Sequence, residues 1–300
     1  METGKSNFGG HFRSFAYNHT NMKKLLYPLV ICTLLMTAQA QDYEKRPWMS
    51  LENRIGLALG IGTVTYLDKN TSPLIYRSKP ANVRLFYNLE SNTFLFSLDV
   101  DFRIGSNQPK YHPNRTLYFR EEDYTGKTED KKFPAGGSFM AGRISLGTYY
   151  KIPSTQESTF KVAVGGRISN ELFYPQGWTM AGMFNALSFS PEGMVQHRIN
   201  EHHSLAANLR VPVVAWPARP SYDNTVSAPD KNLVSGFFSN AEWTGVKKFL
   251  APALGLRYDY QFSQRWGAGL QYEANWYSIQ TPQPFRGTTQ TVLANFYHHF

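Results

Sequence analysis

The chain has 300 residues, of which 42% are hydrophobic, 15% are aromatic and 18% are charged, and its formal net charge is +9. The aromatic content excludes disorder, the single cysteine excludes a disulfide scaffold, and the lack of any run of 18 apolar residues excludes a helical membrane protein. A membrane β-barrel is not excluded, because only every second residue of its strands faces lipid. The modest positive charge comes without a nucleic-acid-binding motif, so nucleic acid is not an expected partner.

The N-terminus resembles a secretory signal peptide. A short basic stretch follows Met22, residues 25–36 are apolar, and a small-x-small motif ends at Ala40. We expect translation to begin at Met22 and cleavage to fall between Ala40 and Gln41. Cys32 is not expected to carry a lipid anchor, because the isoleucine before it stands where a small residue is needed.

The rest of the chain alternates between apolar and polar residues. In the segment 93–105 the even-numbered positions are apolar, whereas Asp99, Asp101 and Arg103 occupy the other phase. Such alternation predicts a strand with one apolar and one polar face. Ten segments follow this pattern: 54–66, 81–90, 93–105, 138–152, 159–172, 183–199, 203–216, 249–262, 265–277 and 288–300. In none of them does the apolar phase contain Asp, Glu, Lys or Arg.

A water-soluble sandwich also alternates, but three features favour a membrane barrel. Most segments are longer than the roughly 5–6 residues usual in soluble sheets. Their polar phase is rich in glycine and alanine, as the inside of a narrow barrel requires. Aromatic residues near segment ends suit the interfacial girdles of a barrel: Tyr66, Tyr150, Trp216, Phe249, Phe262, Trp266 and Trp276. We therefore predict an all-β fold, an antiparallel up-and-down transmembrane β-barrel of about ten strands.

The predicted barrel sets the domain organisation. We expect an N-terminal extension and signal peptide over 1–40, a periplasmic segment over 41–53, and the barrel over 54–300. The connections after even-numbered strands are short, and most of those after odd-numbered strands are longer. Because such barrels have short periplasmic turns and long external loops, the long connections are expected outside the cell. The two largest are 106–136 and 217–248.

The C-terminus carries a family resemblance. The chain ends at Phe300, with Phe296 in the same phase of the last predicted strand. This pattern resembles the terminal signature of outer-membrane β-barrels, although His298 departs from the apolar residue usual at its position. The whole chain resembles the small outer-membrane barrel proteins of Gram-negative, Bacteroidota-like bacteria. The resemblance implies an outer-membrane location and recognition by the outer-membrane barrel assembly machinery.

The polar phase places many charges inside the predicted barrel. The candidate lumen network comprises Arg84, Asp99, Asp101, Arg103, Arg143, Arg167, Glu171, Glu192, Arg210, Arg257, Asp259 and Glu273. A filter selective for one sign of charge would show rings of that charge, whereas this set is nearly balanced. Ten strands also leave little room inside the barrel, so we expect ion pairs to fill the lumen. A narrow passive pore is the alternative.

Catalytic motifs are weak. His202 and Ser204 have the spacing of an outer-membrane lipid hydrolase, but they fall at a predicted turn. Asp99 and Asp101 resemble half of the paired-carboxylate site of outer-membrane proteases, but no Asp-x-His motif accompanies them. No catalytic residue, metal or cofactor is predicted. We expect a structural or surface-interaction role through the long loops, with outer-membrane lipid, lipopolysaccharide and an unidentified surface ligand or protein as partners. A lipid hydrolase and a passive pore are the alternatives.

Overall fold

The computed structural model describes residues 53–300 apart from 92, 123–124, 154–158, 178–181 and 221–230. The predicted signal peptide, the cleavage between Ala40 and Gln41, and residues 41–52 lie outside the described residues. Within this part of the chain, no helix has both the length and the apolar character needed to cross a membrane.

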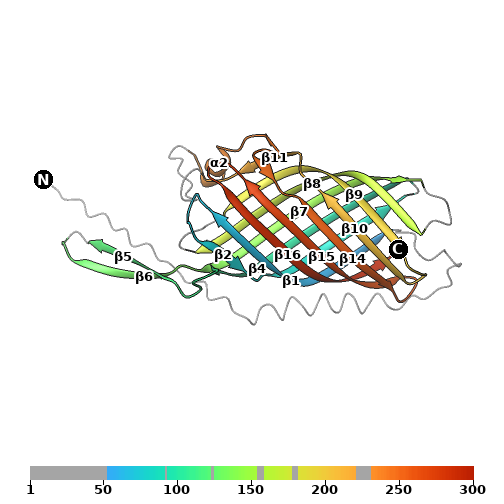
Figure 1. Ribbon diagram of the computed structural model, residues 1–300, viewed down its shortest axis with the longest axis horizontal. Coiled ribbons are helices and arrows are strands. Elements are labelled where there is room, and N and C mark those ends of the chain that lie inside the picture. The colour runs from blue at the N-terminus through green and yellow to red at the C-terminus, as the bar shows by residue number, and fades with distance from the viewer. Residues whose placement is uncertain (1–52, 92, 123–124, 154–158, 178–181, 221–230) are drawn as a thin grey trace. The chain divides into compact units, whose positions relative to one another are not determined.

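Ten long strands form a closed ring (Figure 1). Each strand pairs antiparallel with its neighbours in chain order, and the last strand pairs with the first. The ring strands are β1 (Arg54–Asp68), β3 (Ala81–Glu90), β4 (Phe94–Pro109), β7 (Gly137–Ile152), β8 (Phe160–Gly177), β9 (Phe184–Arg198), β10 (His203–Arg210), β14 (Ala253–Gln261), β15 (Trp266–Ile279) and β16 (Phe285–His299). The predicted antiparallel β-barrel is confirmed.

Three ring strands, β3, β10 and β14, are interrupted, and a short separate strand extends each of them. The short strands are β2 (Ile75–Ser78), β11 (Val214–Ala218) and β13 (Phe249–Leu250). They pair with β1, β9 and β15, which are also neighbours of the interrupted strands. A proline lies at each break: Pro80, Pro212 and Pro252. Because proline has no N–H to donate, it interrupts the hydrogen-bond ladder. The prediction of continuous strands over 203–216 and 249–262 was therefore wrong.

The two ends of the barrel differ. At the short-turn end, the connections between ring strands run over 91–93, 153–159, 199–202 and 262–265. At the long-loop end, the chain adds β5 (Thr116–Glu122), β6 (Thr128–Pro134), the helix α2 (Leu233–Phe238) and β12 (Thr244–Gly245), which pairs with β11. β5 and β6 form a two-stranded sheet of their own. The predicted alternation of loop lengths agrees with this arrangement, but the hairpin and the helix were not predicted.

Candidate functional site in the lumen

Alternate residues of each ring strand point into the lumen, because successive side chains of a strand face opposite sides of the sheet. From the long-loop end to the short-turn end the lumen contains three successive features. We call them the aromatic plug, the central network and the lower cavity, and define each below by its residues. Most of their side chains stand in the polar phase of the alternation.

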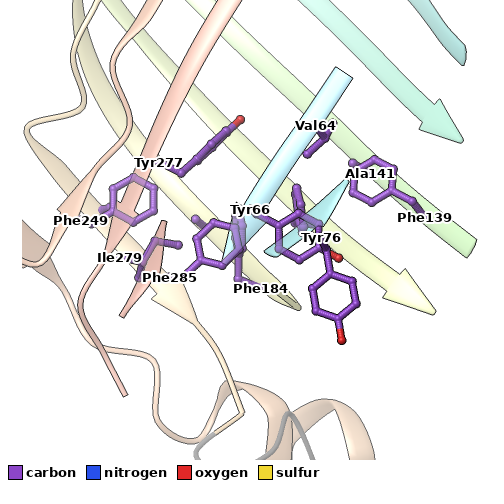
Figure 2. Close-up of a cluster of buried hydrophobic side chains, with 13 residues drawn as sticks. Val64, Tyr66, Tyr76, Phe139, Ala141, Phe184, Phe249, Tyr277, Ile279 and Phe285 are labelled. Atoms are coloured by element: carbon purple, nitrogen blue, oxygen red, sulfur yellow. The ribbon is translucent and has the colours of Figure 1, made fainter. Parts of the chain in front are cut away.

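The aromatic plug closes the lumen near the long-loop end (Figure 2). It consists of buried side chains from the ring strands and their short continuations: Val64, Tyr66, Tyr76, Phe139, Ala141, Phe173, Phe184, Ala186, Ala215, Phe249, Tyr277, Ile279 and Phe285. The ring of Phe173 lies 4.9 Å from Phe139 and 5.1 Å from Phe184, measured between centroids. Tyr66 and Phe249 were predicted to lie in the lipid-facing girdle, and that prediction was wrong because both residues are buried inside.

A buried ion pair joins four connections at the long-loop end of the barrel, beyond the aromatic plug. Arg219 donates to the carboxylate of Asp68 at 2.6 Å and to the carbonyl oxygens of Thr281 and Gln283 at 3.0 and 2.7 Å. The second oxygen of Asp68 accepts a hydrogen bond from the backbone N–H of Gly182 at 2.7 Å. Burial lowers the pKa of the Arg219 guanidinium, and the Asp68 carboxylate opposes that effect. We call this pair the loop latch; sequence reasoning missed it.

The central network lies below the aromatic plug and is built around two carboxylates. Asp101 binds Arg84 at 2.8 Å and Arg103 at 2.9 Å. Glu273 binds Arg84 at 2.7 Å. All of these side chains are almost completely buried. Buried charges are stable only when they are paired and hydrogen-bonded, and these paired side chains occupy this part of the lumen.

Other charges extend the central network around the barrel. Glu273 also binds Arg143 at 2.8 Å and Arg210 at 3.1 Å. Arg103 lies 3.9 Å from Glu171, which accepts a hydrogen bond from Tyr277 of the aromatic plug at 2.9 Å. The network therefore contacts the plug directly.

A second carboxylate group borders the lower cavity. Arg167 binds Asp99, and it binds Glu192 at 2.7 Å. Tyr149 donates to Glu192 and accepts from Arg167, both at 2.8 Å. Asn208 donates to Glu192 at 2.7 Å. Tyr149 belongs to this group although the sequence analysis did not single it out.

The lower cavity occupies the half of the lumen nearest the short-turn end. Its volume is about 140 Å³, and charged and polar side chains line much of it. Arg257 binds Asp259 there at 2.8 Å, and the buried Arg54 lies 3.7 Å from the same carboxylate. Arg54 was not among the predicted lumen residues, although it stands in the phase of the small inward residues of the first predicted strand. That phase was the signal that could have identified it.

The residues of the two catalytic alternatives have other contacts in the structure. Each of the paired carboxylates Asp99 and Asp101 binds its own arginines. The His202 imidazole contacts the backbone oxygen of Gln261 at 2.9 Å, while Ser204 is buried and accepts a hydrogen bond from Gln196. Among the described residues, no group of three or more His, Cys, Asp or Glu is arranged to hold a metal ion.

The C-terminal residues lie on the outer face of the barrel. Phe296 is 58% exposed, and Phe300 stacks on Tyr87 with ring centroids 6.0 Å apart. The N–H of Phe300 donates to the backbone oxygen of Asn53, which brings the two ends of the described chain together. Their role in assembly stays a prediction.

The outer face of the ring is apolar. Large hydrophobic side chains are exposed all around it, among them Ile61, Leu85, Ile144, Leu270 and Phe296, while the ionised side chains of the central network face inward. A closed ring of strands with an apolar exterior and a polar interior is the arrangement of outer-membrane barrels, since only closed barrels can leave no sheet edge in lipid. The protein is an outer-membrane β-barrel.

No family model and no curated protein sequence matches the chain. Among solved structures, it is similar to the outer-membrane protease OmpT from Escherichia coli, at 7% identity and a TM-score of 0.47, over 86% of this chain and 99% of that one. It is also similar to an outer-membrane channel from Pseudomonas putida F1, at 10% identity and a TM-score of 0.40, over 88% and 100% of the two chains. Neisserial surface protein A is 9% identical, with a TM-score of 0.34, over 82% and 97%.

Proposed function

We propose that this protein is a closed outer-membrane barrel that acts at the cell surface through its long loops, in a structural role or by contacting a ligand or partner. The observation that carries the proposal is the double closure of the lumen by the aromatic plug and the central network. Barrels of about eight strands have an interior just wide enough for side chains, whereas open porins have 16–18 strands. Ten strands with buried side chains across the lumen favour a barrel that does not conduct.

The hairpin formed by β5 and β6 is exposed along almost its whole described length. Its strands are joined by cross-strand pairs: Phe119 packs on Phe133 with centroids 5.8 Å apart, and Arg120 binds Asp130 at 3.2 Å. Tyr118 is 66% exposed. An isolated hairpin is only marginally stable, and each cross-strand pair contributes about 0.2–1 kcal/mol. These pairs support an ordered surface that presents aromatic and charged side chains away from the sheet.

The loop with α2 offers a second exposed surface. Trp216 stacks on Phe238 with centroids 5.4 Å apart and lies 6.5 Å from Trp243, which is 65% exposed. Tryptophan is enriched where one end of a side chain is in lipid and the other in water. This cluster supports contact with the outer-membrane lipid and lipopolysaccharide that we propose as partners, beside the assembly machinery and an unidentified surface molecule. An origin in Bacteroidota-like bacteria stays a prediction from the sequence.

Conductance across a planar bilayer tests the closed lumen. Purified, folded protein is added to the bilayer, and we expect no current steps above those of detergent alone. A known open porin prepared in the same detergent is the positive control. Reproducible current steps from the folded protein would contradict the closed barrel. They would favour the passive pore, of which the lower cavity would then be a part.

Site-specific photo-cross-linking in intact cells tests the surface role. A photoreactive amino acid replaces Tyr118 in the hairpin or, as the matched control, Tyr150, which lies 44% exposed on the lipid-facing side. We expect a discrete cross-linked species at position 118 and none of the same mass at position 150. If position 118 gives no cross-link in any growth condition tested, the hairpin is not the interacting surface.

A further inference from the structure

The side chains that line the lower cavity are more exposed at its short-turn end than at its inner end. At the short-turn end, Lys161 is exposed, and the side chains of Lys151 and Arg257 are 23% and 26% exposed. At the inner end, Arg84 and Glu273 are each only 5% exposed and belong to the central network. A small solute can therefore reach the cavity from the short-turn side, and the central network stops it there.

Cationic side chains outnumber carboxylates in the cavity wall. The cations are Arg54, Arg84, Arg143, Lys151, Lys161, Arg167, Arg210 and Arg257, and the carboxylates are Glu90, Asp99, Glu192, Asp259 and Glu273. Many of these pair with each other. Arg84, Arg143 and Arg210 belong to the central network, where Asp101 is a further carboxylate close to Arg84 and Arg143. The wall nevertheless retains an excess of positive charge, which attracts anions into a confined space.

The excess is concentrated near the opening. Asp259 is shared between Arg257 at 2.8 Å and Arg54 at 3.7 Å, and Glu90 binds Lys151 at 2.7 Å. Three cations therefore share two carboxylates in this part of the wall.

Arg54 is deeply buried, yet its ion pair with Asp259 is long. It is 4% exposed, and its Nε is a buried donor without a hydrogen-bond partner among the described residues. Its guanidinium carbon lies 5.7 Å from the ring centroid of Phe86 and 5.4 Å from that of Tyr297. A buried guanidinium with one distant counter-ion is costly, and an oxyanion in the cavity would compensate it with charge-assisted hydrogen bonds.

The wall also offers acceptors. Within the described part of the chain, one oxygen each of Asp259, Glu90 and Asn295 is buried without a hydrogen-bond donor. A ligand that carries a hydroxyl group beside its charge can donate to such oxygens, which a bare halide cannot do.

We propose that the lower cavity binds a small hydrophilic anion that carries a carboxylate or phosphate group and enters from the short-turn side. This goes beyond the surface role proposed above, because it assigns a binding site to the opposite end of the barrel. It requires no passage through the lumen.

Isothermal titration calorimetry of the full, folded protein in detergent tests the site. The probes are citrate, a hydroxylated carboxylate, and inorganic phosphate, each against potassium chloride at equal ionic strength. We expect saturable binding of one equivalent of at least one probe and none of chloride. The probe that binds more tightly shows whether the site prefers a carboxylate or a phosphate group.

Two variants locate the binding. Lys161→Gln removes a cation at the opening and leaves the pairing of Asp259 intact, whereas Arg257→Gln removes the close partner of that carboxylate. Each is expected to weaken binding about tenfold, as the loss of one charge-assisted hydrogen bond implies. Lys131→Gln, which makes the same charge change on the β5–β6 hairpin, is the matched control and should bind like the unaltered protein. Heat-modifiable migration on gels verifies that each variant is folded.

The proposal is overturned if neither probe binds saturably to the folded protein. It is also overturned if Lys131→Gln weakens binding as much as Lys161→Gln does, because the effect would then be general charge attraction. Neither result bears on the surface role, whose tests are conductance and cross-linking.

Discussion

Two glycines on the barrel wall differ in what surrounds them. A Cβ atom added to Gly60 on β1 would lie 1.9 Å from the backbone oxygen of Val292 on β16. One added to Gly193 on β9 would meet nothing within 4 Å. Gly60 therefore stands where the last strand closes on the first, and its missing side chain allows the two backbones to approach.

Gly60→Ala is expected to destabilise the barrel by about 1–3 kcal/mol, because overpacking forces the two backbones apart. The measurement is urea unfolding of the protein in lipid vesicles, followed by tryptophan fluorescence. Gly193→Ala makes the same chemical change at an open position and should stay within about 0.5 kcal/mol of the unaltered protein. Equal effects of the two variants would show that the closing strands are not tightly packed at Gly60.

Glu273→Gln is expected to destabilise the barrel by about 3–5 kcal/mol, because it leaves three buried arginines with one counter-ion fewer. The same unfolding experiment measures it. Glu121→Gln breaks the exposed pair with Lys131 on the hairpin and should cost no more than about 1 kcal/mol. If the two variants unfold alike, the central network does not hold the lumen together.

Alternation could predict which residues face inward but not which of them meet. Asp101 and Glu273 were both assigned to the lumen, yet their shared partner Arg84 is 189 residues before Glu273, and the contact depends on the closure of the ring. Tyr66 shows the opposite failure. Its phase is inward, but its place near a strand end led to a girdle assignment, because an aromatic plug inside the barrel has no local pattern of its own.

At the scale of elements, the observed strands agree with the predicted segments where the apolar–polar alternation runs without interruption. The predicted segment 81–90 and the strand β3 have the same bounds. The segment 203–216 was treated as one strand although Pro212 lies within it, and the known effect of proline on a ladder could have placed the break. The β5–β6 hairpin could not be predicted, because its exposed strands are charged on both faces and show no alternation.

Replacing residues 116–134 by a short glycine-serine linker should leave the barrel intact, because among the described strands β5 and β6 form a separate sheet. Heat-modifiable migration and unfolding stability are expected to match those of the complete protein. Loss of the folded gel species in the deletion would show that the hairpin supports the barrel, and would contradict its treatment as a presented surface.

At the scale of the whole molecule, the loop latch and the aromatic plug lie at the long-loop end, and the lower cavity lies toward the short-turn end. This asymmetry combines residues from distant parts of the chain, such as Asp68 and Arg219, which fall in two different predicted loops. Sequence patterns identify loops by their polarity, so they could not indicate that two loop residues would be buried together.

Arg219→Ala should loosen the connections at the long-loop end without opening the lumen. The variant removes the donor to Asp68, Thr281 and Gln283, so we expect faster trypsin cleavage at the exposed Lys247. Conductance should stay absent, because the central network is unchanged. Cleavage at the normal rate would argue against a role of the latch in holding the loops.

The account depends on which face of the wall meets lipid, and neighbouring residues on one strand test it most directly. Ile144 is 56% exposed on the outer face, and Ser145 is 1% exposed inside. The chain is produced without residues 1–40, which contain its one cysteine. Ile144→Cys and Ser145→Cys are each spin-labelled in vesicles, and their accessibility to oxygen, which concentrates in lipid, is measured. High accessibility at position 144 and low accessibility at position 145 is the predicted result. Equal values, or the reverse order, would contradict a barrel with its apolar face in the membrane and its charges within.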